Sequence, residues 1–328
     1  MEYELTIGKI RGLRQLADDS GLFIMTAMDH RGSLEKGLCR RPDTDCYTAM
    51  KEFKLDLCRA LAPQSSAVLL DPIYGAAQAI RAGALPGNTG LLVSVEATGY
   101  EGGKTARVTR LLEGWGVDKI KKMGASAVKM LVYFRPDAGE LTRIQLDTVA
   151  RTAEDCREHD IPFLVEPVSY ALDGETPEAF GAVKTSIVVR TAELMTALPI
   201  DVLKAEFPAD MKLVTDDVDL LDACRALDTA SARPWVILSA GADYEVFRRQ
   251  VELACRAGAS GFLGGRAIWQ EAVGMTDRDT RQSFFETTAV NRLLELIEVT
   301  RRWGRPWTAR GLPESVIEPN GNWYRDYR

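Results

Sequence analysis

The chain has 328 residues, and 46% of them are apolar, which is enough for a large core and excludes a disordered chain. The formal net charge is −6 and the basic residues are scattered, which excludes a cationic stripe for a nucleic-acid backbone. The first residues lack the pattern of a secretory signal, and no apolar run approaches the roughly 20 residues that span a bilayer. We therefore expect a soluble, cytoplasmic protein with no nucleic-acid and no membrane partner.

Eight short apolar runs alternate with amphipathic segments along the chain. The runs, which we predict as strands, cover residues 22–28, 67–70, 91–95, 127–134, 163–165, 202–207, 235–238 and 261–263. The predicted helices cover residues 44–61, 76–82, 139–159, 177–198, 213–227, 244–257 and 279–302. Eight strands alternating with helices predict a single (β/α)8 TIM barrel over residues 1–302. A doubly wound open sheet is the alternative, but the first predicted strand runs into DHRG (29–32) instead of a GxGxxG turn.

Residues 303–328 form an aromatic C-terminal extension beyond the predicted barrel. Three of the six tryptophans lie in this stretch. Such a tail is expected to pack on the barrel of its own chain or on a neighbouring subunit, and we favour the first interpretation. We also expect the protein to be a homo-oligomer.

The cysteine and histidine contents argue against disulfides and against a zinc site. None of the six cysteines belongs to a CxxC pair, so we expect reduced thiols. The two histidines are His30 and His159, whereas a zinc enzyme usually draws two or three imidazoles into one site. We expect no metal and no other cofactor, although a carboxylate site for magnesium stays open.

Lys204 lies inside the predicted strand at residues 202–207, where an ammonium group is costly to desolvate. Desolvation lowers the pKa of a lysine and leaves part of it as the free amine, which attacks a ketone to form a Schiff base. The alternative is a structural ion pair with Glu206, whose side chain lies on the same face of the strand. Lys204 alone leaves the two interpretations about equal.

Polar residues at the ends of the other strands favour chemistry, because the active site of a TIM barrel lies at the carboxyl ends of its strands. We assign a candidate to every strand except the third. The candidates are Asp29, Asp71, Lys129, Glu166, Lys204, Ser239 and the run Gly264-Gly265-Arg266. Two lysines, an aspartate and a glutamate that converge from four strands are hard to explain as packing.

Lys129 and Glu166 are the predicted partners of Lys204. Two neighbouring ammonium groups repel, which lowers the pKa of at least one of them. Glu166 precedes Pro167, which keeps the chain extended where a general base would be positioned. The structural alternatives are an ion pair of Lys129 with Asp29 or Glu166, and a pairing of Glu166 with Lys204.

Two glycine-containing loops, SAG (239–241) and GGR (264–266), follow the last two predicted strands. In TIM barrels, the backbone N–H groups at this place commonly bind phosphate. Glycines let the backbone approach an anion, and Arg266 adds a fork of donors. We therefore predict a phosphate site, against the alternative that these glycines only form turns.

Eight sequence pieces occur in order at compatible spacing between about residues 20 and 275. They are MDHRG (28–32), LDPIYG (70–75), TGY (98–100), AVK (127–129), IPF (161–163), VLKAE (202–206), LSAG (238–241) and GFLGGRA (261–267). In these pieces the chain resembles the class I, Schiff-base tagatose 1,6-bisphosphate aldolases, a group that also includes the sulfofructose phosphate aldolases.

The resemblance implies a metal-independent aldolase that reversibly cleaves a phosphorylated ketose, such as tagatose 1,6-bisphosphate, to dihydroxyacetone phosphate and glyceraldehyde 3-phosphate. It implies Lys204 as the lysine that forms a covalent iminium, Lys129 and Glu166 in acid/base roles, and Asp29 beside them. The residues expected to bind the substrate and its phosphate groups are His30, Arg31, Arg135, Ser239, Gly241, Gly264, Gly265 and Arg266.

Several alternatives stay open. His30 stands where the family usually carries Gln, and Arg135 suits a second phosphate or a sulfonate, so a sulfofructose phosphate aldolase is the alternative enzyme. Transaldolase is less favoured, because its lysine lies on the fourth strand, where this chain has Lys129. From another class, a non-catalytic barrel could sense sugar phosphates, but an intact set of Lys204, Lys129, Glu166 and Asp29 argues against it.

Overall fold

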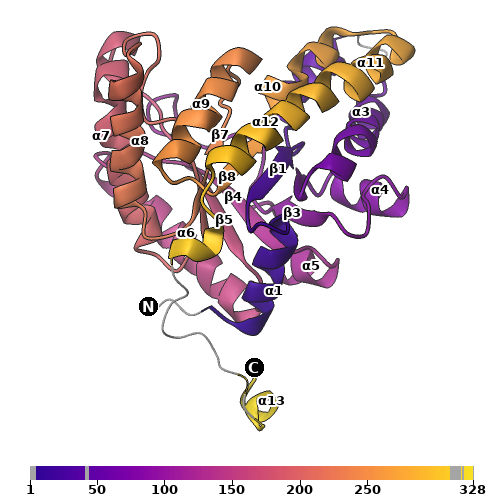
Figure 1. Ribbon diagram of the computed structural model, residues 1–328, viewed down its shortest axis with the longest axis horizontal. Coiled ribbons are helices and arrows are strands. Elements are labelled where there is room, and N and C mark those ends of the chain that lie inside the picture. The colour runs from indigo at the N-terminus through magenta and orange to yellow at the C-terminus, as the bar shows by residue number, and fades with distance from the viewer. Residues whose placement is uncertain (1–4, 41–43, 311–318, 320, 328) are drawn as a thin grey trace.

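The computed structural model describes residues 5–40, 44–310, 319 and 321–327, and it confirms the predicted (β/α)8 barrel (Figure 1). Eight parallel strands follow one another in chain order, and β1 closes the barrel by pairing with both β2 and β8. The strands are β1 (Phe23–Ala27), β2 (Ala67–Leu70), β3 (Gly90–Ser94), β4 (Ala127–Tyr133), β5 (Phe163–Val168), β6 (Val202–Ala205), β7 (Trp235–Leu238) and β8 (Gly261–Gly264).

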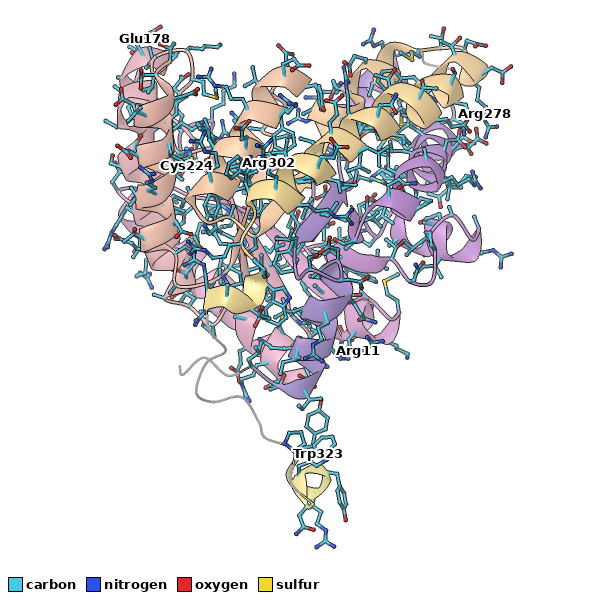
Figure 2. The ribbon with its side chains drawn as sticks, in the orientation of Figure 1. Arg11, Glu178, Cys224, Arg278, Arg302 and Trp323 are labelled. Carbon is cyan, nitrogen blue, oxygen red and sulfur yellow. A yellow bond between two sulfur atoms is a disulfide. The ribbon has the colours of Figure 1, made fainter. Side chains whose placement is uncertain are left out.

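Helices surround the barrel, and their outer faces carry charged side chains such as Glu178 and Arg278 (Figure 2). Those that follow the first seven strands are α2 (Gly32–Leu38), α3 (Cys46–Leu61), α4 (Ala76–Arg81), α5 (Val117–Lys122), α6 (Glu140–Glu158), α7 (Pro177–Thr196), α8 (Asp217–Ala230) and α9 (Tyr244–Ala257). Those that follow β8 are α10 (Arg266–Trp269), α11 (Arg278–Phe284) and α12 (Val290–Trp303), and a π-helical turn, Phe285–Ala289, joins the last two.

Capping side chains explain where several helices begin. The Asp45 carboxylate accepts a hydrogen bond from the backbone N–H of Thr48, so α3 begins at Cys46 and not at residue 44. In the same way Asp216 caps α8, which begins at Asp217, four residues after the predicted start. The two helices therefore begin a few residues after their predicted starts, while the order of the elements in the barrel is as predicted.

The sequence patterns missed three elements near the ends of the barrel. α1 (Ile7–Leu16) precedes the first strand, and its Leu13 and Leu16 pack into the apolar cluster inside the barrel. α2 is a short helix directly after β1, and α5 lies between β3 and β4. A hairpin follows β3, where Glu96 pairs with Leu111. α1 closes the base of the barrel, whereas the hairpin and α2 border its mouth.

The beginning of the C-terminal extension packs on the base of the barrel. Trp307 is buried in the cluster inside the barrel, and its backbone N–H donates to the carbonyl of Gly21 at 2.9 Å. α13 (Trp323–Asp326) lies beyond the base of the barrel, with Trp323 labelled in Figure 2. Residues 311–318, 320 and 328 of the predicted extension lie outside the described residues.

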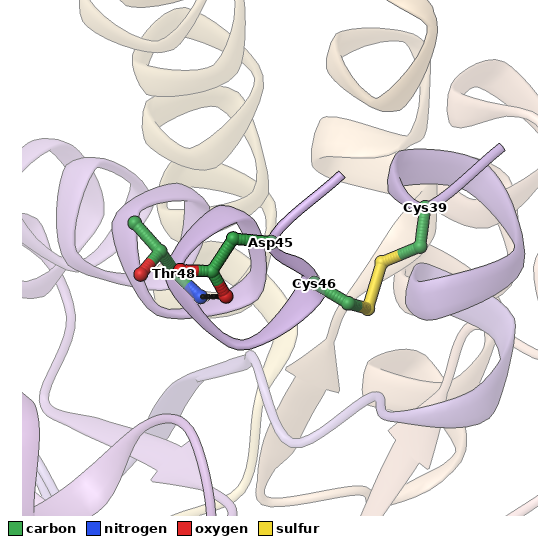
Figure 3. The surroundings of a disulfide bond; sticks show 4 residues. All are labelled: Cys39, Asp45, Cys46 and Thr48. Atoms are coloured by element: carbon green, nitrogen blue, oxygen red, sulfur yellow. Dashed lines mark hydrogen bonds between the residues drawn. A yellow bond between two sulfur atoms is a disulfide. The ribbon is translucent and has the colours of Figure 1, made fainter. Parts of the chain in front are cut away.

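The expectation of six reduced thiols is wrong for two cysteines. Cys39 and Cys46 form a disulfide that joins the residue after α2 to the first residue of α3 (Figure 3). α2 and α3 lie against each other, and the Cα atoms of the two cysteines are 5.4 Å apart, within the usual range for a disulfide. The remaining cysteines are buried free thiols: Cys58, Cys156, Cys224 and Cys255. In the part of the chain that the structure describes, no helix has the length and apolarity to cross a membrane.

Candidate active site

The alternation of side chains along the strands brings the polar residues to the inside of the barrel. In β6, Val202 belongs to the inner apolar cluster and Lys204 follows two residues later; Leu164 and Glu166 are related in the same way in β5. Residues two apart on a strand point to the same face. The charged groups therefore form the layer above the apolar interior, at the carboxyl ends of the strands.

These residues line a cavity of about 720 Å³ at the carboxyl ends of the strands. Nine of the residues predicted for the site lie in its wall: Asp29, His30, Arg31, Lys129, Glu166, Lys204, Ser239, Gly265 and Arg266. Lys36, Tyr133 and Glu206 add further polar groups to the wall. Gly241, Gly264 and Arg135 are not part of it.

Glu166 bridges the two buried lysines of the site. Its Oε1 atom lies 2.7 Å from Lys204 Nζ, and its Oε2 atom lies 2.9 Å from Lys129 Nζ. The alternative partner of Lys204, Glu206, instead accepts hydrogen bonds from the backbone N–H and the hydroxyl of Ser169, at 2.7 and 2.6 Å. The pairings that the sequence left open thus resolve into one network around Glu166.

Lys129 is surrounded by three carboxylates. Besides Glu166, its Nζ atom contacts Asp29 Oδ2 at 2.7 Å and Glu96 Oε1 at 2.8 Å. Burial alone would lower the pKa of Lys129, but the three carboxylates together raise it well above its ordinary value. The nearby second lysine therefore does not make Lys129 a neutral amine at physiological pH.

Asp29 and Glu166 stay ionised in this environment. Burial would raise the pKa of Asp29, but the charges of Lys129 and Lys204 and the hydrogen bond from Lys129 outweigh it and lower that pKa below its ordinary value. The pKa of Glu166 is lowered for the same reason, since Lys129 and Lys204 outweigh the effect of burial. The site therefore contains carboxylate bases in direct contact with ammonium groups.

Glu96 is the site residue that the sequence interpretation missed. It follows β3, the strand to which we assigned no candidate, and its side chain is 7% exposed in the cavity wall. Its carbonyl oxygen also accepts a hydrogen bond from Arg31 Nη2 at 2.6 Å. The available signal was a carboxylate immediately after an apolar strand, the same pattern that identified Asp29 and Glu166.

His30 is held as a neutral imidazole beside the network around Glu166. Burial lowers its pKa to about 3, and the attraction of Asp29 for an imidazolium does not compensate. The ring packs edge-on against Trp269, with centroids 5.1 Å apart. Gly265 makes room for it, because a Cβ atom there would lie 2.8 Å from His30 Cε1.

The loops after β7 and β8 place Arg266 in the cavity wall with Ser239. Gly241 contributes indirectly: its φ is +75°, and a Cβ atom there would lie 3.2 Å from the guanidinium carbon of Arg266. Gly264 faces away from the cavity, where an added Cβ would lie 2.8 Å from the ring of Phe247. These two glycines support the packing of the loops and do not line the expected phosphate site.

Two predicted candidates are structural residues. Arg135 donates to both carboxylate oxygens of Asp137 and of Glu175, and it is 1% exposed outside the cavity wall. Asp71 is paired with the buried Lys54 behind the wall. The guanidinium of Arg135, expected to face the substrate, instead directs its donors to Asp137 and Glu175 and not into the cavity.

The described residues contain no group of three or more His, Cys, Asp or Glu side chains with the geometry of a metal site. The three carboxylates that converge in the cavity are instead paired with lysine, as the contacts of Lys129 with Asp29, Glu96 and Glu166 show.

Comparison with known proteins gives a consistent picture. A model of the DeoC/LacD family of aldolases matches residues 23–271. The chain is 31% identical over 326 residues to a tagatose 1,6-diphosphate aldolase of Lactococcus lactis, covering 93% of this chain and 98% of that one. It is 30% identical to tagatose 1,6-diphosphate aldolase 2 of Streptococcus mutans, covering 92% and 97%.

Solved structures share the fold at lower identity. An archaeal fructose 1,6-bisphosphate aldolase superposes with a TM-score of 0.59 at 21% identity, covering 87% of this chain and 98% of that one. The fructose-bisphosphate aldolase of Plasmodium falciparum superposes with a TM-score of 0.67 at 15% identity, covering 90% and 94%.

Proposed function

The chain belongs to the DeoC/LacD family of aldolases, and from this premise we propose that it reversibly cleaves tagatose 1,6-bisphosphate or a closely similar ketose bisphosphate. The products are dihydroxyacetone phosphate and glyceraldehyde 3-phosphate. The observation that carries the proposal is a buried carboxylate, Glu166, that bridges Lys204 and Lys129 in the wall of a 720 Å³ cavity.

Lys204 is the nucleophile of the two lysines. One carboxylate contacts Lys204, whereas three contact Lys129, and together they hold Lys129 in its protonated form. The free amine of Lys204 attacks the C2 ketone, and loss of water gives an iminium. This choice disfavours a transaldolase mechanism, which would require Lys129 as the nucleophile.

The iminium makes the cleavage step possible. Glu166 accepts the proton of the C4 hydroxyl, the C3–C4 bond breaks, and its electron pair moves into the iminium to give an enamine. The aldehyde half then leaves. Protonation of the enamine at C3 and hydrolysis of the regenerated iminium release dihydroxyacetone phosphate, while the ammonium of Lys129 keeps Glu166 and Asp29 oriented.

Two groups of cations fit the two phosphates of such a substrate. The first group is Arg266, which lines the cavity together with Ser239 of the loop after β7. The second group is Arg31 and Lys36, which line the cavity from the segment after β1. Arg135, the residue that favoured a sulfonate, lies outside the wall, so no specific observation supports the sulfofructose phosphate alternative.

Borohydride trapping tests the proposal. Incubation with dihydroxyacetone phosphate and borohydride should add the mass of a reduced triose phosphate at Lys204, because the hydride reduces an iminium at C2. An adduct at Lys129 would instead support transaldolase-like chemistry. A protein that binds ketose bisphosphates without cleaving them or forming an adduct would be a sensor. Activity should survive EDTA, and a loss that zinc restores would exclude the Schiff-base route.

A further inference from the structure

The side chain of Glu96 has one carboxylate oxygen that the protein leaves unused. Oε1 accepts from Lys129 Nζ at 2.8 Å, but Oε2 is buried and has no hydrogen-bond partner among the described residues. A buried carboxylate oxygen without a partner is costly, and nearly all such atoms in proteins are satisfied. Because Glu96 lines the cavity, a bound molecule can supply the missing donor.

The backbone around Glu96 is held in place on several sides. Its carbonyl oxygen accepts from Arg31 Nη2 at 2.6 Å. The preceding Val95 donates its N–H to the Lys129 carbonyl at 3.0 Å, and the following Ala97 donates to the Arg110 carbonyl at 2.8 Å. The backbone that carries Glu96 Oε2 is therefore held in a fixed position, which a group that discriminates between substrates requires.

We propose that Glu96 Oε2 accepts a hydrogen bond from the C3 hydroxyl of the bound ketose and so determines which ketoses and triose phosphates the enzyme uses. The proposal rests on the Schiff-base function assigned above to Lys204.

The connectivity of the network indicates which hydroxyl is bound. Glu96 contacts Lys129, Lys129 contacts Glu166, and Glu166 contacts Lys204, which is bonded to C2 in the iminium. Within two carbons of C2, the C1 oxygen carries a phosphate and the C4 hydroxyl is assigned to Glu166. The C3 hydroxyl is the remaining donor near the bond that breaks, and it stays on the triose half as the hydroxymethyl group of dihydroxyacetone phosphate.

A pair of trapping ligands tests this assignment without requiring cleavage. Dihydroxyacetone phosphate carries the hydroxyl, whereas hydroxyacetone phosphate has a methyl group in its place. Both present a ketone to Lys204, which forms an iminium with loss of water and is then reduced by borohydride to a secondary amine. The measured quantity is the concentration of each ligand that gives half-maximal adduct by mass spectrometry.

The native enzyme should prefer dihydroxyacetone phosphate by about tenfold or more, the worth of a hydrogen bond to a charged group. In Glu96→Ala, the ratio of the two half-maximal concentrations should fall to within about threefold of unity. In Glu96→Gln, the preference should be at least halved, because an amide oxygen is a weaker acceptor than a carboxylate oxygen. The comparison is a ratio on one protein preparation, so partial unfolding of a variant does not change it.

The control is Glu101→Gln, which makes the same charge change on the same hairpin. Glu101 is paired with Arg110, and its side chain is 58% exposed, outside the cavity wall. This variant should keep the native preference. If Glu96→Ala keeps the full preference as well, the unused oxygen is filled by water and the proposal is wrong. If the native enzyme forms no adduct with either ligand, the Schiff-base function itself fails.

Discussion

Buried lysines paired with carboxylates occur at both ends of this barrel, and the two ends differ in how the charges are shared. At the base, Lys9 of α1 is 1% exposed and contacts Asp201 at 2.9 Å, and the same carboxylate oxygen accepts the N–H of Phe163 at 2.8 Å. At the mouth, Glu166 is shared between Lys129 and Lys204. Neither Lys9 nor Asp201 lines the cavity, whereas all three mouth residues do.

The comparison shows that burial of a lysine does not by itself indicate chemistry. The pair of Lys9 and Asp201 at the base connects α1 to the start of β6 and lies away from the cavity. The network at the mouth combines three carboxylates with two ammonium groups beside open space. Charged side chains that line a cavity can exchange protons and hydrogen-bond partners with a bound substrate. A buried ion pair away from the cavity cannot.

The largest expected effect is at the mouth. Lys204→Met should reduce turnover of a ketose bisphosphate by at least about 10³-fold, because the iminium no longer forms. The melting temperature should change little, since Glu166 keeps Lys129 as its partner. Steady-state kinetics and thermal unfolding check both parts. Turnover above about one hundredth of the native rate would mean that Lys204 is as structural as Lys9.

The same substitution of the lysine at the base, Lys9→Met, should lower stability and leave turnover nearly unchanged. Lys9→Met leaves Asp201 buried without its ammonium partner, so the free energy of unfolding should fall by about 3–5 kcal/mol. The rate per trapped active site should stay within about twofold of native. Urea unfolding and active-site titration measure the two quantities.

Adding Asp201→Asn to Lys9→Met should recover part of the lost stability, because the amide is uncharged and its oxygen still accepts from Phe163. A variant of Lys9 that remained fully stable but lost turnover would invalidate the distinction between the two ends.

The sequence predicted most of the fold because the strands of a parallel barrel are short apolar runs with helices between them. It also predicted most of the mouth, since polar residues at strand ends such as Asp29, Glu166 and Lys204 interrupt those runs visibly. It missed Glu96, although Glu96 follows the predicted third strand directly, as Asp29 and Glu166 follow theirs. The residue itself follows the same rule as the others.

Features set by tertiary contacts were not predictable in the same way. α1 packs its apolar face against the apolar interior of the barrel. Lys9 of α1 contacts Asp201, which is 192 residues away in the sequence. Arg135 looks like a free cation in sequence, but its two carboxylate partners are Asp137, in the same loop, and Glu175, in the loop between β5 and α7. The disulfide depends on how α2 and α3 pack against each other, which spacing alone does not specify.

Reduction of the disulfide should loosen the mouth and leave the base unchanged. Cys39 and Cys46 are seven residues apart, and closing so short a loop contributes about 2–3 kcal/mol in the chain-entropy account. Dithiothreitol should therefore speed amide exchange in α2, which carries Lys36 of the cavity wall, without changing exchange in α1. The double variant Cys39→Ser, Cys46→Ser should be insensitive to the reductant. Equal sensitivity in that variant would assign the effect to something else.

Arg266, which lines the cavity, and Arg135, which lies outside its wall, should separate substrate binding from folding. Arg266→Ala should raise KM for a ketose bisphosphate about tenfold or more, because a charge-assisted contact to phosphate contributes about 1.5–3 kcal/mol. Trapping with an unphosphorylated ketone should change much less. Arg135→Ala should instead lower the melting temperature, since it leaves Asp137 and Glu175 without their partner, and it should leave the KM ratio of the two ligands unchanged. Equal losses for both ligands in Arg266→Ala would make Arg266 structural.

The smallest expected effect concerns pH. The pKa of His30 is lowered to about 3 in the folded protein, so between pH 3 and its ordinary value near 6.5 the unfolded chain binds a proton that the folded chain does not. Stability therefore falls as the pH is lowered through this window, by about 1–2 kcal/mol between pH 6.5 and 5. The lowered pKa of Glu166 acts at lower pH, because its contribution is present above about pH 4–5 and is lost only below that.

Urea unfolding at pH 7 and pH 5 checks this expectation by comparing the native enzyme with His30→Gln, which removes the titrating group but keeps a polar side chain. The native protein should lose more stability on acidification than the variant does, and neither kcat profile should show a limb near pH 6.5. Equal losses in the two proteins would mean that His30 is not held neutral by burial.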